Sequence, residues 1–286
     1  MINEDRFDRQ VRFFGRDGQE KIRALSVGIV GVGGLGSHLV QQLAHLGVAR
    51  IAVIDPDKVS PSNLNRLIGV NSNDPARKTW KTSVARRLVN YIDPSIEMVE
   101  IANTVISKES FQALKEADFV FGCVDNDGPR LMLTEFCAAY KRPYFDLATE
   151  ILPGHPPIYG GRLCFSVDGQ GCLVCLDQLS PQEAREYFLS VPSKRDEDAI
   201  YGVPRGGLNG QAPSVVSLNG VVASLAATEF MVEATGLRRA RQVLSYHAEE
   251  GKVFLGQDKP TPDCFYCRSV YGSGLKANVE RYLSLS

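Results

Sequence analysis

The chain has 286 residues, of which 44% are hydrophobic and 23% charged. This composition is typical of a folded globular protein and excludes a disordered or collagenous chain. Its 32 basic and 33 acidic residues give a formal net charge of -1, so the overall charge supplies no attraction to nucleic acid or anionic membranes. We therefore expect no membrane partner, and a nucleic-acid partner would need a local basic patch.

Two features of the sequence, its charged N-terminal residues and the polar content of its longest charge-free stretch, indicate the cytoplasm. Residues 1–21 are charged throughout and lack the apolar stretch of a secretory signal. The longest charge-free stretch, residues 206–228, holds too many polar side chains for a membrane span and indicates a buried helix. Four of the seven cysteines lie in two Cys-x-x-Cys pairs, which in a reducing compartment favours metal binding over disulfides.

Apolar strands alternate with amphipathic helices along the chain, the pattern of an α/β fold with a largely parallel, Rossmann-like doubly wound sheet. A strand at residues 26–30, a helix at 36–45 and a strand at 50–54 form a first βαβ unit. The next predicted elements are a helix at 81–91 and short strands at 97–101, 119–123 and 143–145.

The character of the chain changes after residue 150. Residues 151–157 contain three prolines, and residues 176–213 form a long charged segment of the kind that often acts as a lid or binding loop. The last predicted elements are a helix at 214–232 and antiparallel closing strands at 243–246 and 253–255. We expect a single domain over residues 1–268, with 176–213 as a crossover segment, and a polar, mobile tail at 269–286.

A glycine-rich turn, Gly31-Val-Gly-Gly-Leu-Gly36, lies between the first strand and the first helix. The glycines are Gly31, Gly33, Gly34 and Gly36. Their lack of a Cβ lets backbone N–H groups approach a phosphate. Asp55 ends the following strand, where a carboxylate accepts hydrogen bonds from ribose hydroxyls. Together these features predict a nucleotide site without choosing between NAD and ATP.

Cationic residues after Asp55 favour a triphosphate over a dinucleotide. Arg66 can form a bidentate contact with phosphate oxygens, and Lys81, at the start of a predicted helix, can act as a point charge. Each of them alone is more often a solvated surface charge. An NAD-dependent dehydrogenase has no need of this pair, so that reading is disfavoured.

The order of these motifs resembles the ThiF/MoeB/HesA superfamily, the ATP-dependent activating enzymes for ubiquitin-like and sulfur-carrier proteins, over roughly residues 6–267. The resemblance implies that Asn63 and Arg66 bind the triphosphate and that Lys81 is the phosphate-binding lysine, with Lys78 as a competing assignment. The opening Arg6-Phe-Asp-Arg9-Gln10 matches the family segment whose second arginine reaches into the partner subunit's active site. We therefore expect a homodimer in which Arg9 serves the neighbouring protomer.

Cys123-Val-Asp125-Asn126 matches the family segment that supplies an acid near Mg²⁺ and the reacting phosphate. Asp125 follows an apolar strand, where α/β sheets present ligand-binding groups; the alternative is a plain Asp-Asn turn. The chemistry that the resemblance implies is adenylation, in which a carboxylate attacks the α-phosphorus of ATP and pyrophosphate leaves. Arg9, Arg66, Lys81 and Asp125 would then act by positioning and charge neutralisation.

The paired cysteines predict a closed structural zinc site. Cys172, Cys175, Cys264 and Cys267 have the two-residue spacing that turns both sulfurs of a knuckle toward one tetrahedral ion. Free or redox-active cysteines are the alternative.

Family members that form a thioester usually carry the acceptor cysteine after the first knuckle, but residues 176–263 contain no cysteine. The remaining thiols, Cys123, Cys137 and Cys164, lie in apolar contexts that favour inert packing. We expect adenylation of the C-terminal carboxylate of a ubiquitin-like or sulfur-carrier protein without a thioester in the crossover segment. A downstream conjugating enzyme or a sulfur donor would then consume the adenylate directly. The alternative is an oxyester at a serine of the crossover segment, Ser180, Ser190 or Ser193, but a hydroxyl is a poor nucleophile without a positioned base. The alternatives are activation of a small-molecule or tRNA-borne carboxylate, or a non-catalytic partner subunit.

Overall fold

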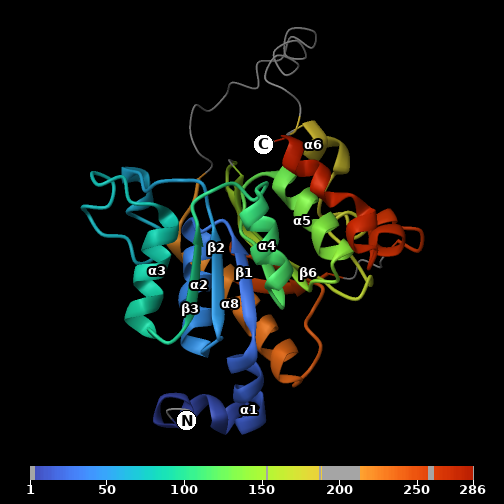
Figure 1. Cartoon of the computed structure of the whole chain (residues 1–286). Coiled ribbons are helices and arrows are strands. Elements are labelled where there is room, and N and C mark those ends of the chain that lie inside the picture. The colour runs from blue at the N-terminus through green and yellow to red at the C-terminus, as the bar shows by residue number, and fades with distance from the viewer. Residues whose placement is uncertain (1–3, 153, 187, 189–212, 257–260, 286) are drawn as a thin grey trace.

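The computed structural model describes residues 4–152, 154–186, 188, 213–256 and 261–285. The described strands form one sheet in the order β3-β2-β1-β4-β5-β6-β7-β8 (Figure 1). In chain order they are β1 (Ser26–Val30), β2 (Arg50–Ile54), β3 (Glu97–Ile101), β4 (Phe119–Gly122), β5 (Tyr144–Leu152), β6 (Ile158–Ser166), β7 (Val243–His247) and β8 (Lys252–Leu255).

The sheet is parallel from β3 to β5 and antiparallel from β5 to β8. After β1 the chain runs to β2 and β3 on one side, and it then returns to β4 on the other side of β1. This reversal makes a crevice outside the carboxyl ends of β1 and β4, where open α/β sheets bind their ligands. The predicted fold class, a Rossmann-like and largely parallel sheet with antiparallel C-terminal strands, is confirmed.

Helices cover both faces of the sheet. They are α1 (Glu4–Ala24), α2 (Gly34–Leu46), η1 (Pro61–Asn63), α3 (Lys81–Ile92), α4 (Lys108–Glu116), α5 (Asp127–Ala139), α6 (Pro181–Glu186), α8 (Val216–Thr235), η2 (Tyr266–Val270), η3 (Gly274–Ala277) and η4 (Val279–Leu285). The core between the sheet and α2, α3 and α8 includes Leu39, Phe145 and Phe230. A second core, against α4, α5 and the C-terminal helices, includes Leu114 and Phe136.

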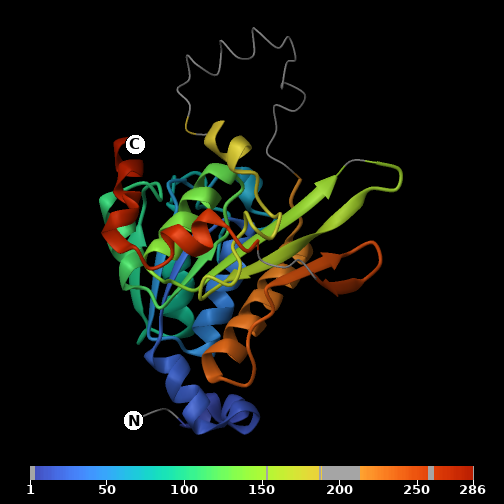
Figure 2. The ribbon, with the colours of Figure 1, turned by 90° about the vertical axis from the view of Figure 1, so that its right-hand side faces the viewer.

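The first half of the predicted elements agrees with the structure, but α1, α4, α5, α6 and the β5–β6 hairpin were not predicted. The strand expected at 143–145 continues to Leu152 and pairs along its whole length with β6. The hairpin was not predicted because residues 151–157 contain three prolines, which argue against a strand. Two of them, Pro156 and Pro157, lie in the turn region between β5 and β6. Figure 2 shows the outer parts of this hairpin and of β7–β8 projecting from the body of the molecule.

Gly160 explains why β6 gives a weak strand signal in the sequence. A Cβ at this position would lie 1.9 Å from the Tyr246 carbonyl oxygen of β7. Close approach of two strands therefore requires glycine here, although glycine lowers the strand propensity of the segment.

Residues 269–285 differ from the mobile tail expected from the sequence. Val279 is fully buried and Tyr282 is 6% exposed. Arg281 forms an ion pair with Glu135 of α5 at 2.7 Å. The apolar residues of this segment are too few to give a clear helical pattern, yet they pack against α5. The boundary of the single domain stays a prediction.

Two further expectations concern residues near gaps in the described chain. The buried helix expected within 206–228 corresponds to α8 where the structure describes it, and residues 206–212 lie outside the described residues. Most of the crossover segment 176–213 lies outside them as well. No helix in the described part of the chain combines the length and apolar character needed to cross a membrane.

Candidate nucleotide site and metal centre

The glycine loop closes tightly at the carboxyl end of β1. Gly31 has φ +85°, and a Cβ there would lie 2.6 Å from the Cys123 carbonyl oxygen. A Cβ at Gly36 would lie only 2.0 Å from the Gly31 carbonyl oxygen. Any larger residue at these two positions would force the loop away from itself and from the end of β4. The glycines are thus required by the geometry of the β1–α2 turn.

The loop ends in the N-terminus of α2, which suits an anion. Gly33 is the N-cap residue and has no side chain to cap the helix. A Cβ on Gly33 would meet no described atom within 4 Å, so the space beside it is open. Backbone N–H groups at a helix N-terminus favour phosphate in such a space. A nucleotide phosphate therefore fits these residues.

Asp55 lies buried beneath the loop and holds it. Its carboxylate accepts hydrogen bonds from the backbone N–H of Val32 at 2.8 Å and of Asp57 at 2.9 Å. Burial raises the pKa of the Asp55 carboxyl, while the Lys81 ammonium and the two N–H donors act in the opposite direction. The structure thus shows Asp55 organising the loop, and its contact with a ribose stays a prediction.

Lys81 lies in the site and Lys78 lies on the surface of the preceding loop. The Lys81 ammonium is 2.7 Å from Asp57 Oδ2 and 3.8 Å from Asp55 Oδ1. Its side chain is 12% exposed, whereas Lys78 is exposed and has φ +52°. Lys81 therefore lies beside Asp55, which binds the glycine loop, and its assignment as the phosphate-binding lysine in place of Lys78 stays a prediction. Asp57, which the sequence argument did not single out, is its closest anion.

Arg66 and Asn63 come from the loop that follows β2. The Arg66 side chain lies against the start of α2, with its Cγ and Cδ 3.3 Å from the position of a Cβ on Gly34. The Ile68 N–H donates to Ser37 Oγ of α2 at 3.0 Å, which anchors this loop on the helix. Asn63 is buried, and its Oδ1 accepts the Ser60 N–H at 2.9 Å. Arg66 thus lies beside the glycine loop, and Asn63 lies buried in the same loop after β2.

Asp125 follows β4 at the same edge of the sheet and is exposed. Its Oδ1 accepts a hydrogen bond from Asn126 Nδ2 at 2.8 Å. Arg130 of α5 donates to the Val124 carbonyl oxygen at 2.7 Å and to Asp127 at 2.9 Å, so it fixes the backbone on both sides of Asp125. An exposed carboxylate beside an open crevice can hold a magnesium ion, which takes oxygen ligands.

Arg9 does not lie with the other predicted residues. It is exposed on α1, which leads directly into the amino end of β1, opposite the glycine loop (Figure 1). Arg6 pairs with Asp93 after α3, and Gln10 donates to the His45 carbonyl near the end of α2. One chain therefore brings together Arg66, Lys81 and the Asp125 loop but not Arg9.

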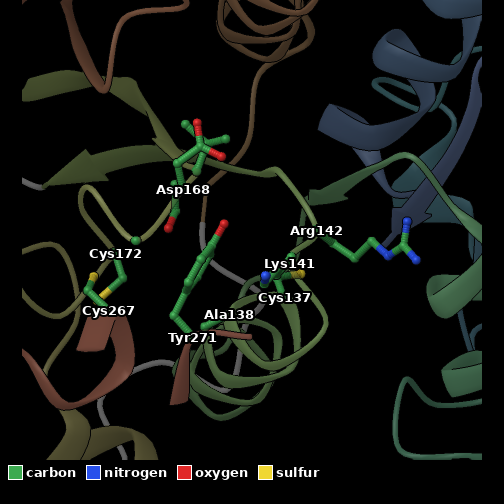
Figure 3. Close-up of a pocket in the computed structure, with 11 residues that line it drawn as sticks. Cys137, Ala138, Lys141, Arg142, Asp168, Cys172, Cys267 and Tyr271 are labelled. Atoms are coloured by element: carbon green, nitrogen blue, oxygen red, sulfur yellow. The ribbon is translucent and has the colours of Figure 1, made fainter. Parts of the chain in front are cut away.

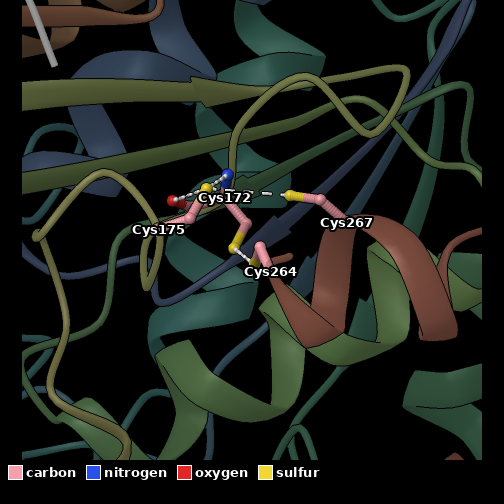
Figure 4. Close-up of side chains that lie close together, drawn as sticks. All are labelled: Cys172, Cys175, Cys264 and Cys267. Carbon is pink, nitrogen blue, oxygen red and sulfur yellow. Dashed lines mark hydrogen bonds between the residues drawn. The ribbon is translucent and has the colours of Figure 1, made fainter. Parts of the chain in front are cut away.

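The four cysteines of the two pairs form one cluster (Figure 4). Cys172 Sγ is 3.5 Å from Cys264 Sγ, and Cys175 Sγ is 3.8 Å from Cys267 Sγ. All four sulfurs lie within 4.8 Å of one another. Sulfurs about 2.3 Å from a tetrahedral zinc ion lie about 3.8 Å apart, so the donor set and its spacing fit zinc.

The other three thiols fit packing roles. Cys137 is 3% exposed and Cys164 is fully buried, while Cys123 is half-buried at the end of β4. Burial raises the pKa of all three thiols, which disfavours the nucleophilic thiolate.

A pocket beside the cysteine cluster has charged residues in its wall (Figure 3). Asp168 of this wall pairs with Arg239 at 2.8 Å, and Lys141 Nζ lies 5.8 Å from the centre of the Tyr271 ring. Burial and the neighbouring Asp168 raise the pKa of Tyr271. Because these groups satisfy one another, we interpret the pocket as part of the packing around the cluster.

Sequence reasoning also missed Asn219, which lies against the glycine loop. Its Nδ2 is 2.5 Å from the position of a Cβ on Gly34, and its Oδ1 accepts the Thr149 hydroxyl at 3.1 Å. An asparagine in the charge-free stretch at residues 206–228, which was predicted to be a buried helix, was the available signal, because a buried amide needs partners.

Comparisons with known proteins identify the family of this chain. The ThiF family model matches residues 7–264. The sulfur carrier protein adenylyltransferase of Thermus thermophilus is 26% identical over 267 residues, which are 92% of this chain and 90% of the relative. The molybdopterin-synthase adenylyltransferase of Escherichia coli is 33% identical over 181 residues, 63% of this chain and 70% of the relative.

A solved structure supports the fold. The crystal structure of E. coli MccB with ATP matches with a TM-score of 0.70 at 21% identity, covering 93% of this chain and 75% of that one. The predicted family is confirmed, because its model spans almost the whole chain from the arginine-containing opening to the second cysteine pair. The chain belongs to the ThiF family.

Proposed function

We propose that this protein is an ATP-dependent adenylyltransferase that activates the C-terminal carboxylate of a ubiquitin-like or sulfur-carrier protein. One observation carries the proposal: the glycine loop, the Arg66 loop, Lys81 and the Asp125 loop meet at the crevice between β1 and β4. A triphosphate needs such an arrangement of backbone donors and cations. The curated relatives support the substrate class, since the Thermus thermophilus relative is named a sulfur carrier protein adenylyltransferase and the E. coli relative a molybdopterin-synthase adenylyltransferase.

In the proposed reaction a carboxylate oxygen of the carrier attacks the α-phosphorus of ATP. The new oxygen–phosphorus bond gives an acyl-adenylate, and the bond to the β-phosphate bridge breaks to release pyrophosphate. The chain contributes positioning and charge: the glycine loop and Asn63 bind phosphates, Asp55 binds the ribose, and Arg66 and Lys81 neutralise negative charge.

We propose Mg²⁺ at Asp125 and Zn²⁺ at the four cysteines as the metal cofactors. Magnesium held at Asp125 would supply positive charge that eases attack by an anionic carboxylate. Zinc held by the four cysteines would have a structural role, because four protein thiolates complete a tetrahedral site. Thiolate ligands require reducing conditions, which supports our proposal that the protein acts in the cytoplasm.

The adenylate is proposed to react with an external nucleophile. Residues 176–263 contain no cysteine, and burial disfavours thiolate at Cys137 and Cys164. A sulfur donor or the cysteine of a conjugating enzyme would therefore attack the adenylate directly.

Pyrophosphate exchange into ATP tests the proposed function. Purified protein is incubated with ATP, Mg²⁺ and labelled pyrophosphate, together with carriers that end in Gly-Gly, with small carboxylates or with tRNA. We expect exchange that depends on a carrier protein. Exchange that depends only on a small or tRNA-borne carboxylate would contradict the proposed substrate, and no exchange with any of them would indicate a non-catalytic subunit.

Mixing two inactive variants tests the proposed homodimer. In a dimer where Arg9 serves the neighbouring site, an Arg9→Ala chain paired with an Asp125→Ala chain retains one complete site. We expect the mixture to recover exchange activity that neither variant has alone. Verified mixed dimers that stay inactive would show that Arg9 does not act across the interface.

A further inference from the structure

Asp146 is a fully buried carboxylate to which the sequence argument gave no role. It is the third residue of β5 and is 0% exposed. Arg162 of β6 lies 2.7 Å from its Oδ2, and Arg130 Nε of α5 lies 3.4 Å from its Oδ1. The Tyr144 hydroxyl donates to Oδ1 at 3.0 Å. A charge in such a position is retained only with partners, and here two cations share one anion.

The two arginines reach away from Asp146 in different directions. Arg130 donates to the Val124 carbonyl oxygen at 2.7 Å, immediately before Asp125. Arg162 donates to the Gln178 carbonyl oxygen at 3.2 Å, and the Gln178 N–H donates to the Leu173 carbonyl oxygen at 2.7 Å. Leu173 lies inside the first cysteine knuckle. The chain of contacts from the Asp125 loop to the knuckle therefore passes through one carboxylate.

Both arginines are largely buried, and Asp146 is the carboxylate that they share. Arg130 and Arg162 side chains are 12% and 19% exposed, so water solvates them poorly. Burial opposes the charge on Arg130, but Asp146 and Asp127 raise the pKa of its guanidinium. Without Asp146, two neighbouring buried cations would repel each other, and each would draw away from its backbone carbonyl.

We propose that Asp146 is a positioning residue that holds the Asp125 loop and the first cysteine knuckle in one fixed arrangement, through Arg130 and Arg162. Its importance for catalysis rests on the proposed function, since the loop that it fixes would carry the magnesium-binding acid. The arrangement itself is a property of this chain and can be measured without any substrate.

The first experiment measures the arrangement by hydrogen–deuterium exchange. In Asp146→Asn, which keeps the shape of the side chain and removes its charge, we expect faster exchange in residues 123–130 and in residues 172–180. The matched control is Glu229→Gln, because Glu229 is also a buried carboxylate paired with an arginine, Arg238, at 2.7 Å. The control should leave both segments unchanged. The proposal would be overturned if either segment of Asp146→Asn exchanged no faster than in the wild-type protein. It would also be overturned if Glu229→Gln accelerated exchange in both segments to the same extent.

A second variant keeps the test decisive if Asp146→Asn does not fold. Arg130→Lys retains a cation beside Asp146 but cannot span both Asp146 and the Val124 carbonyl. We expect faster exchange in residues 123–130 and unchanged exchange in residues 172–180. Faster exchange in both segments of this variant would indicate general destabilisation. It would contradict the proposal that Arg130 holds residues 123–130 while Arg162 holds residues 172–180.

The second experiment asks whether the arrangement matters for the reaction. Displacement of a catalytic group by about 1 Å can cost about 100-fold in rate. We expect Asp146→Asn to lower pyrophosphate exchange by about 10- to 100-fold and to raise the Mg²⁺ concentration needed for half-maximal rate, with unchanged zinc content. Wild-type rate and Mg²⁺ dependence would overturn the role in the reaction. If the wild-type protein itself shows no exchange, the proposed function fails while the hydrogen–deuterium result still stands.

Discussion

Replacement of Asp125 by asparagine should lower ATP–pyrophosphate exchange by about 100- to 1000-fold, the usual effect of removing one electrostatic contact to a transition state. Asp125 is an exposed carboxylate at the crevice between β1 and β4, where the proposed Mg²⁺ and phosphates would lie. Asparagine keeps the shape of the side chain and an oxygen for the Asn126 donor, but it lacks the negative charge. The rate should be measured at saturating ATP over a range of Mg²⁺ concentrations.

Glu250→Gln provides a control for this substitution. Glu250 is an exposed carboxylate near the β7–β8 turn, paired with Lys252 at 3.0 Å, and it lies outside the proposed site. Its substitution should leave exchange unchanged. If Asp125→Asn retained wild-type exchange and Mg²⁺ dependence, Asp125 would be a plain turn residue, and the proposed metal position would have to be abandoned.

Removal of zinc should be the most destabilising single change outside the proposed nucleotide site. The four cysteines join a loop after β6 to the start of η2, and the paired sulfurs are 92 residues apart in the sequence. An ion that binds only the folded state at ~1000 times its dissociation constant stabilises that state by about 4 kcal/mol. We expect one zinc per chain, and chelation or Cys264→Ser should lower the free energy of unfolding by an amount of this order.

Metal analysis together with denaturant unfolding checks this prediction. Cys137→Ala is the matched control, because Cys137 is a buried cysteine of α5 outside the cluster. It should alter stability through packing and leave the zinc content at one per chain. A reduced, folded protein with well under one zinc, or with the same unfolding free energy before and after chelation, would contradict the assignment.

The first βαβ unit and α3 were predictable because their strands and helices are regular and end at clear signals. Gly31 begins the loop and Gly47 ends α2 with φ +84°, so the periodic pattern alone locates the elements. α1 was not predictable in the same way, because its charged sequence continues through Gly15, which has φ +79° inside the helix. Its stability comes from tertiary contacts such as Phe7 against Gly47, which no local pattern reveals.

The residues of the candidate site also differ in whether local sequence or only tertiary contacts reveal them. Sequence motifs located Asp55, Arg66 and Lys81, because each follows a strand or begins a helix at the carboxyl edge of the sheet. Asp146 escaped notice, since a carboxylate inside a strand signals a buried charge only when its partners are known. Those partners, Arg130 and Arg162, precede and follow it by 16 residues, and only the fold brings the three together.

The cap on η1 also determines which atoms Asn63 presents. Its Oδ1 accepts the Ser60 N–H and the Ser60 hydroxyl, at 2.9 and 3.2 Å. These hydrogen bonds fix the orientation of the amide, so that Oδ1 faces Ser60. The N–H groups of Nδ2 are then the donors that the side chain can offer to a ligand. For the proposed phosphate contact the rotational entropy of this residue is lost during folding and not during binding. Aspartate at this position would preserve the cap but present an acceptor to the phosphate, so the contribution of residue 63 to anion binding depends on the Nδ2 of asparagine.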